Sequence, residues 1–220
     1  GSNPMLVVYH YYRFKVSLDD VVELMELRGI HLSHQTVHNW TQTFGVELGL
    51  KIRKKRKDKS GKKVHIDSTY IKIEGRWCCF YRAIDKQGNL VDVYLSDARD
   101  KASAIAFFRS ANTVTGIMPA KVTSDKNPAY PDAITQSFGL NTQHRTNRYL
   151  NNLVEQSHRG IKSRYSPMKS FKDFFCALNF CYVFEELRNY FRALNCKNLA
   201  RNRIMTSKFH EYIFLLNTTK

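Results

Sequence analysis

Apolar residues recur every three or four positions through the N-terminal part of the chain, which is the spacing of amphipathic helices. The pattern predicts three helices, over 5–15, 17–29 and 33–45. Serines precede the second and third of them at Ser17 and Ser33, where a hydroxyl can cap the first helical turn. Gly29 and Gly45 stand where these helices are expected to stop.

Two helices joined by a short glycine-containing turn predict a helix-turn-helix, completed by 5–15 to a three-helix unit. Val37, Trp40 and Phe44 would form the buried face of the third helix. The polar residues off that face are the candidate base contacts: His34, Gln35, His38 and Asn39. A solvated helical hairpin is the alternative. A metal site at the clustered histidines is disfavoured because no Cys or carboxylate completes a ligand set nearby.

From position 64 the pattern changes to short β-rich runs separated by turn residues. It predicts strands over 64–73, 76–85, 90–96, 120–124 and 140–144, and helices over 101–110, 128–138, 149–164 and 171–194. Pro167 is expected to prevent continuation of the helix before it. Three meandering strands followed by strands alternating with helices are the order of an RNase H-like α/β fold. The last helix is apolar on nearly all faces, which indicates core packing or, alternatively, a dimer interface.

The balance of charge is strongly basic, with 35 Lys and Arg against 19 Asp and Glu, a net charge of +16. Half of it lies in KIRKKRKDKSGKK, which has nine basic residues and one acidic residue. This run has no apolar periodicity, so 51–63 is predicted to be a linker between a domain at 1–50 and one at 64–220. Within it, the residues expected to contact DNA phosphates are Lys54, Lys55, Arg56 and Lys57. A tether without a partner is the alternative.

Composition excludes several classes of protein. At 43% hydrophobic residues the chain is too apolar to be a disordered basic tail. No uncharged apolar stretch is long enough for a membrane span, so no membrane partner is expected. Five cysteines without a CxxC pair fit unbridged thiols in a reducing compartment. We expect a folded cytoplasmic, nucleoid-associated protein that handles nucleic acid.

Three carboxylates stand in unusual places. Asp67 interrupts an apolar β-branched strand, Asp125 follows the end of a short strand, and Glu155 lies on a helix with Arg159 and Lys162 on nearly the same face. Gathered together, three carboxylates repel one another unless divalent cations screen them, and hard oxygen ligands suit Mg²⁺ or Mn²⁺. Two such ions can support phosphoryl transfer. The rival aspartates Asp85, Asp92, Asp97 and Asp100 are assigned to ordinary hairpin and loop positions. Asp85→Asn and Asp92→Asn are expected to be nearly silent for cleavage and joining of DNA.

Local blocks of the sequence resemble a DDE transposase of the insertion-sequence family six. They are YYRFKVSLDDVVELMELRGIHLSHQTVHNW, HIDSTYIKIEGRW, YRAIDKQGNLVDVYLS, TSDKNPAY and NNLVEQSHRGIKSR, in that order. The resemblance implies that Asp67, Asp125 and Glu155 form a metal-binding catalytic triad and that Lys162 contacts DNA. The spacing of 29 residues between Asp125 and Glu155 is shorter than in better-known members.

The resemblance further implies metal-dependent cleavage and strand transfer of double-stranded DNA, with terminal inverted repeats as substrate, a target DNA, and a homodimer or higher oligomer that holds two element ends. Two alternatives remain at this point. One is another RNase H-like integrase or nuclease, and the other is a transposase-derived helix-turn-helix regulator without catalysis.

Overall fold

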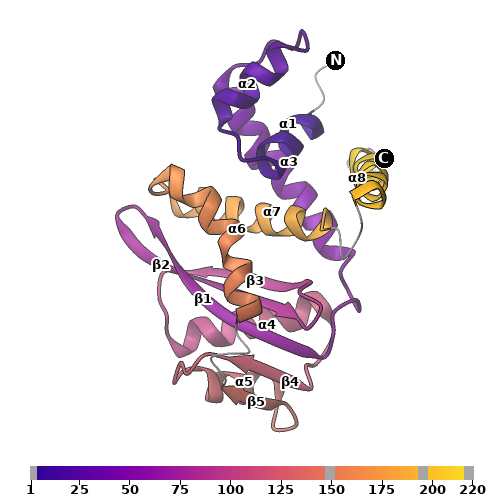
Figure 1. The fold of residues 1–220 in the computed structure, drawn as a ribbon. Coiled ribbons are helices and arrows are strands. Elements are labelled where there is room, and N and C mark those ends of the chain that lie inside the picture. Colours follow the sequence, from indigo (N-terminus) through magenta and orange to yellow (C-terminus); the bar gives the residue numbers. More distant parts are fainter. Residues whose placement is uncertain (1–3, 147–151, 193–197, 216–220) are drawn as a thin grey trace. The chain divides into compact units, whose positions relative to one another are not determined.

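The computed structural model describes residues 4–146, 152–192 and 198–215 (Figure 1). The chain forms two compact units, and their boundaries do not follow the predicted domains. One unit comprises 53–181, and the other combines 1–52 with 182–220. The C-terminal segment therefore belongs with the N-terminal helices, whereas the sequence places all of 64–220 in one domain.

The unit of residues 53–181 is built on a five-stranded mixed sheet. Its strands are β1 (Lys63–Ile73), β2 (Arg76–Asp85), β3 (Leu90–Ser96), β4 (Lys121–Ser124) and β5 (Gln143–Thr146). The spatial order is β3-β2-β1-β4-β5 (Figure 1). The first three strands are antiparallel to one another, β4 pairs in parallel with β1, and β5 pairs in parallel with β4. This is the RNase H-like α/β arrangement predicted from the order of the elements, and the fold is confirmed.

Helices cover both faces of this sheet. They are α4 (Lys101–Thr115), α5 (Tyr130–Phe138), α6 (Asn152–Met168) and the first part of α7 (Phe174–Tyr190). Side chains of β1 point alternately to the two faces. Val64 and Ile66 join α4 and α5 in one hydrophobic core, while α6 packs against β1 from the other side.

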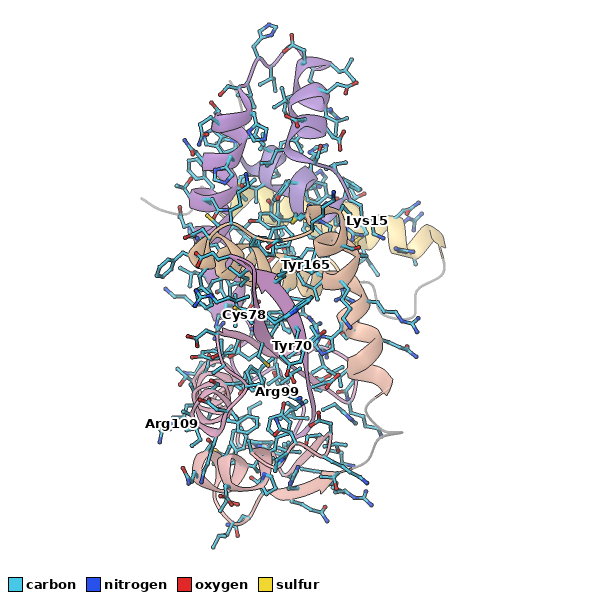
Figure 2. All side chains as sticks on the ribbon, turned by 90° about the vertical axis from the view of Figure 1, so that its left-hand side faces the viewer. Lys15, Tyr70, Cys78, Arg99, Arg109 and Tyr165 are labelled. Carbon is cyan, nitrogen blue, oxygen red and sulfur yellow. The ribbon has the colours of Figure 1, made fainter. Side chains whose placement is uncertain are left out.

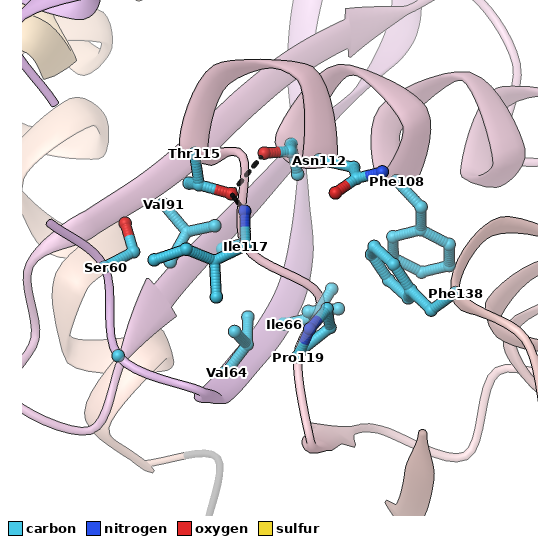
Figure 3. Close-up of a pocket in the computed structure, with 13 residues that line it drawn as sticks. Ser60, Val64, Ile66, Val91, Phe108, Asn112, Thr115, Ile117, Pro119 and Phe138 are labelled. Atoms are coloured by element: carbon cyan, nitrogen blue, oxygen red, sulfur yellow. Dashed lines mark hydrogen bonds between the residues drawn. The ribbon is translucent and has the colours of Figure 1, made fainter. Parts of the chain in front are cut away.

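A small cavity lies within the core beneath α4, lined mainly by apolar side chains including Val64, Ile66, Val91 and Phe108 (Figure 3). Its volume of about 20 Å³ would hold a single water molecule. Because Val64 and Ile66 face α4 and α5, the cavity lies on the opposite face of the sheet from Asp67.

The other unit contains α1 (Pro4–Arg13), α2 (Leu18–Glu26), α3 (His34–Lys54), the end of α7 and α8 (Asn198–Phe214). Both predicted serine caps are present. Ser17 and Asp20 form a reciprocal capping box at α2, and the Ser33 hydroxyl accepts the Thr36 N–H at 3.1 Å before α3. The three predicted N-terminal helices are therefore confirmed at their starts.

The predicted stop of the third helix at Gly45 is wrong, because α3 continues to Lys54. A Cβ at Gly45 would approach the Tyr12 ring to 3.2 Å, and one at Gly49 would approach the Tyr182 ring to 2.9 Å. Both glycines are buried within the helix. They allow other elements to approach α3 closely, so they serve packing rather than termination.

The buried face of α3 also differs from the predicted one. Val37 is fully buried, but Trp40 and Phe44 are half-buried and contact each other edge to face at 6.3 Å. The buried positions continue instead along Thr41, Gly45, Leu48, Gly49 and Ile52. Thr41, Gly45 and Gly49 carry little hydrophobicity, so the stripe that joins Val37 to Leu48 and Ile52 is interrupted in the sequence.

The segment predicted to be a linker is largely part of the folded units. Lys51–Lys54 complete α3. The Arg53 guanidinium forms an ion pair with Asp92 at 3.0 Å and also donates to Ser110 Oγ at 2.9 Å. Arg56 is buried and donates to the carbonyl oxygens of Leu90 and Val91, at 2.7 and 2.8 Å. These contacts fix the start of the segment to β3 and α4.

Two rival aspartates have structural roles that the sequence did not indicate. Asp92 lies within β3 with no exposed side-chain surface, paired with Arg53 and bonded to Ser110. Asp85 is buried and accepts hydrogen bonds from the N–H groups of Gly61 and Asn89. The assignment of Asp92 to a hairpin or loop position is therefore wrong, because it lies inside β3. Asp100 caps α4 through the Ser103 N–H, as its assignment to a turn allows.

Three smaller differences concern helix and strand ends. Helix α6 extends to Met168 and includes Pro167, whose fixed backbone is tolerated in its last turn. Strand β5 begins at Gln143, three residues later than predicted, and α8 was not predicted.

Apolar residues of α7 such as Ala177, Phe180, Val183 and Leu187 are buried within the single chain, so core packing explains the apolar helix.

Candidate active site

The first candidate carboxylate, Asp67, lies in the middle of β1 on the face covered by α6. Alternation along the strand puts it opposite Val64 and Ile66, which belong to the core below α4 and α5. Its side chain is 15% exposed. Across the antiparallel pair it stands directly opposite Arg82, whose side chain is buried.

The second candidate, Asp125, follows β4 immediately, and β4 is the strand that pairs in parallel with β1. The parallel pair joins Val64 to Val122 and His65 to Thr123. Continuing the same register two residues further places Asp67 level with Asp125 on the neighbouring strand. The loop then turns so that the Asn127 N–H donates to Asp125 Oδ1 at 3.1 Å, which orients the carboxylate.

Helix α6 adds the third element of the site. His158 is 3% exposed, and its Nε2 atom lies 3.5 Å from Asp67 Oδ2. Neither ring nitrogen of His158 has a hydrogen-bond partner among the described residues. Glu155 precedes His158 by one helical turn on α6, so its backbone position lies on nearly the same side of the helix as His158, which contacts Asp67. The side chain of Glu155 lies outside the described residues.

Asp125 is held by a cation of the chain itself. Arg99 Nη2 lies 2.9 Å from Asp125 Oδ2, and both side chains are about one-third exposed, 32% and 34%. Tyr70 and Tyr130 flank this pair (Figure 2 shows Tyr70 beside Arg99). Burial, and then the Asp125 charge, raises the pKa of Tyr130, so its hydroxyl keeps its proton at neutral pH.

The donor set fits a divalent cation. Asp67 on β1 and Asp125 directly after the adjacent strand β4 offer hard carboxylate oxygens, and Glu155 is a residue of α6, which packs against β1. Among the side chains that the structure describes, no three His, Cys, Asp or Glu residues form a metal-binding group. The third carboxylate of the predicted set is the one whose side chain is not described.

Comparison with known proteins identifies the family. A family model for the DDE domain of IS240-type transposases matches residues 61–194, more than half of the chain. The chain belongs to the DDE transposases of the IS6/IS240 family. The match begins just before β1 and includes the positions of Asp67, Asp125 and Glu155. This transposase therefore carries a DDE catalytic domain.

Relatives of the transposase support this assignment over a wider part of the chain. It is 39% identical over 169 residues to the transposase for the insertion sequence-like element IS431mec of Staphylococcus aureus strain Mu50, with 75% of each chain covered. The same identity and coverage hold for the transposase of IS257 in transposon Tn4003 of S. aureus. Among solved structures, the magnesium-bound HTLV-2 integrase catalytic core domain aligns with a TM-score of 0.47 and 18% identity, over 66% of this chain and 97% of that one.

Two residues beside the site were missed in the sequence, His158 and Arg99. His158 lies three positions after Glu155, and this helical spacing on the Asp67 side is a signal that was available. Arg99 gave no such signal, because it contacts Asp125 across 26 residues and through a loop. Only the fold brings that arginine to the carboxylate.

The predicted base-contacting residues lie near the start of α3. His34, Gln35 and Asn39 are exposed, and His38 is half-buried. Gln35 Nε2 donates to Asn39 Oδ1 at 2.8 Å, so these two side chains form one polar pair on the helix surface. His34 Nε2 lies 3.9 Å from Asp19 Oδ1 of α2. The transposase thus presents polar groups at the N-terminal end of α3.

The predicted phosphate-contacting residues divide into two groups. Lys54, Lys55 and Lys57 are exposed, while Arg56 is buried against β3. Because the Arg56 guanidinium is bonded to two carbonyl oxygens of the chain, it is not placed to contact DNA. Arg159 and Lys162 are exposed on α6. None of the helices in the described part of the transposase is long and apolar enough to cross a membrane.

Proposed function

We propose that this transposase binds the terminal inverted repeats of its insertion sequence and catalyses cleavage and strand transfer of double-stranded DNA by in-line phosphoryl transfer. The observation that supports this proposal is the parallel pairing of β1 with β4, because extending its register by two residues aligns Asp67 with Asp125. Helix α6 packs against β1 and carries Glu155 one turn before His158. We infer that these three carboxylates, from distant parts of the sequence, form one metal-binding site.

In this proposal the side chains of Asp67, Asp125 and Glu155 hold two Mg²⁺ or Mn²⁺ ions. When bound, such ions stabilise charge on the attacking and leaving oxygens of a phosphodiester. The chain's own groups orient the carboxylates: the Asn127 N–H fixes Asp125, and His158 and Arg82 flank Asp67. Exposed Arg159 and Lys162 on α6 would hold the DNA backbone near these carboxylates.

In this proposal two regions recognise DNA: the start of α3 and the lysines at and after its end. Exposed His34, Gln35 and Asn39, with half-buried His38, would read base edges in the major groove. Exposed lysines after α3 would contact phosphates. Because strand transfer joins two element ends to a target, we propose that the transposase acts as a homodimer or a higher oligomer.

Substitution of Glu155 by Gln tests the catalytic assignment. It keeps the size of the side chain and its hydrogen bonding but removes the charge, so cleavage and strand transfer should fall together by about two orders of magnitude or more. Binding to the terminal DNA should persist, since a negative charge near phosphates has been lost. The measurement is a cleavage and strand-transfer assay with DNA that flanks the gene, in Mg²⁺, Mn²⁺ and Ca²⁺.

Asp67→Asn and Asp125→Asn should behave as Glu155→Gln does. Asp97→Asn is the matched control, because Asp97 is exposed and close in sequence to the site. Strand transfer by Glu155→Gln at the wild-type rate would refute the triad. Specific DNA binding by a wild-type protein that shows no chemistry in any metal would favour the regulator without catalysis.

A further inference from the structure

The contact between Arg99 and Asp125 is the feature of the site that the proposed chemistry leaves unused. A guanidinium lies 2.9 Å from one oxygen of a carboxylate that the proposed function assigns to metal binding. The other oxygen is taken by the Asn127 N–H. In this state Arg99 supplies the positive charge that a bound cation would otherwise supply.

Two neighbouring tyrosines hold this arrangement at the edge of the site. Arg99 is placed by its interactions with Tyr70 and Asp125, and Tyr130 lies close to both members of the pair. Tyr70 is 48% exposed, so solvent and large ligands reach this side of the pair. Arg99 is thus positioned by the fold but not enclosed by it.

A divalent cation at Asp125 would change the electrostatics of this contact. The carboxylate can neutralise one positive charge, and a guanidinium about 3 Å from it would then stand beside a dication. Repulsion favours movement of Arg99 away from the metal. The nearest anion that a DNA-bound transposase offers is a phosphate, and a planar guanidinium binds phosphate through two parallel hydrogen bonds.

We propose that Arg99 is a positioning residue that alternates between two anions: it holds Asp125 in the metal-free protein and binds a DNA phosphate at the active site once metal has taken Asp125. This inference rests on the proposed function, since it assumes that Asp125 is a metal ligand. It adds a link between metal binding and DNA binding. Metal releases a phosphate-binding arginine, and the arginine in turn competes with metal when DNA is absent.

The test compares Arg99→Gln and Arg99→Lys with wild type, using the full chain. Lys101→Gln is the matched control. Lys101 lies two residues after Arg99 and forms an ion pair of the same length, 2.9 Å, but its partner is Asp132 and not Asp125. The first measurement is the affinity for Mn²⁺ without DNA. Arg99→Gln should bind Mn²⁺ several-fold to about tenfold more tightly than wild type, because a competing charge is gone. Arg99→Lys and Lys101→Gln should stay close to wild type.

The second measurement is the salt dependence of binding to a random-sequence DNA duplex, with and without Ca²⁺. With Ca²⁺, Arg99→Gln should lower the magnitude of the slope of log K against log salt by about 0.9, the effect of one lost phosphate contact. Without divalent cation the slope should match that of wild type, because Arg99 is then paired with Asp125. Thermal unfolding without metal checks that each variant is folded.

The possible outcomes separate this inference from the proposed function. Equal Mn²⁺ affinities of wild type and Arg99→Gln, or a change in slope that is independent of Ca²⁺, would overturn the role of Arg99 and leave the triad intact. A wild-type protein that binds no Mn²⁺, together with an Asp125→Asn variant of unchanged behaviour, would overturn the triad itself and the inference with it.

Discussion

At the scale of single residues, the site is organised by how each acidic group is neutralised. Asp67 faces Arg82 and lies beside His158, and Asp125 is paired with Arg99. Asp92 is neutralised by Arg53 deep in the sheet, where no ligand can replace that partner. Exposure separates the two kinds of aspartate: Asp125 is one-third exposed, whereas Asp92 has no exposed side-chain surface. Only the accessible carboxylates are suited to exchange one cation for another.

Substitution of Asp92 by Asn should therefore destabilise the protein without removing a catalytic group. It leaves the Arg53 guanidinium without its buried counter-charge, which costs about 3 kcal/mol in the free energy of unfolding. Asp97→Asn, on the exposed surface, should change that free energy by less than about 0.5 kcal/mol. Urea unfolding of both variants measures the difference. A stability of Asp92→Asn equal to that of Asp97→Asn would mean that the Arg53 contact contributes nothing.

The sequence indicated Asp67 and Asp125 as candidate site residues but gave no sign of the basic residues around them. Asp67 and Asp125 stand out locally, one as a charge within an apolar strand and the other at a strand end. Arg99 and Arg82 have no local signal, because their partners lie on other elements and are fixed by register and loop geometry. The misassignment of Asp92 has the same origin, since its burial depends on Arg53 and Ser110.

At the scale of elements, prediction worked where one face of an element is strongly apolar. The starts and ends of the first three strands were found to within one residue, because alternation against a single core fixes their register. Helix α3 was predicted too short, because Gly45 was interpreted as a helix stop, whereas Gly45 and Gly49 lie inside the helix and allow close packing. The basic run at 51–63 resembled a linker because it contains a single apolar residue, Ile52, and so has no apolar periodicity.

The division of this basic run leads to a prediction about DNA binding. Replacing Lys54, Lys55 and Lys57 by Ala should lower the magnitude of the slope of log K against log salt by up to about 2.7, because each lost phosphate contact removes about 0.9. Sequence preference should be retained, since phosphate contacts position the protein without reading bases. Binding to duplex DNA over a range of KCl concentrations measures the slope.

Arg56→Gln is the control within the same run. Its guanidinium is bonded to the carbonyl oxygens of Leu90 and Val91, so the substitution should lower the melting temperature and leave the slope unchanged. A slope reduced by Arg56→Gln as much as by one lysine substitution would contradict this division. An unchanged slope in the triple lysine variant would show that the exposed lysines are solvated without contacting DNA.

At the scale of the whole molecule, the N-terminal helices and the C-terminal segment share one core. The Tyr212 hydroxyl donates to the Met5 carbonyl at 3.0 Å, and Tyr9 contacts the rings of Phe191 and Phe209 at 5.1 and 4.7 Å. The partners in these contacts lie more than 180 positions apart in the sequence. No local pattern can indicate such a pairing, and so the predicted boundary between 1–50 and 64–220 separated residues that fold together.

The three N-terminal helices should therefore not fold when residues 1–52 are produced alone. Without the C-terminal segment, Tyr9, Met5 and Val8 would lose partners that bury them, and a three-helix unit of this size has little core of its own. Far-UV circular dichroism of the 1–52 fragment should show low helicity and no cooperative thermal transition.

In the full chain, Phe191→Ala should lower the free energy of unfolding by about 3 kcal/mol or more, because its ring is 2% exposed and packs on Tyr9 and Tyr212. Phe175→Ala, at a ring 72% exposed, is the matched control and should change stability little. A 1–52 fragment that melts cooperatively and binds DNA as tightly as the full chain would show that the N-terminal helices form an independent domain and that the shared core is dispensable.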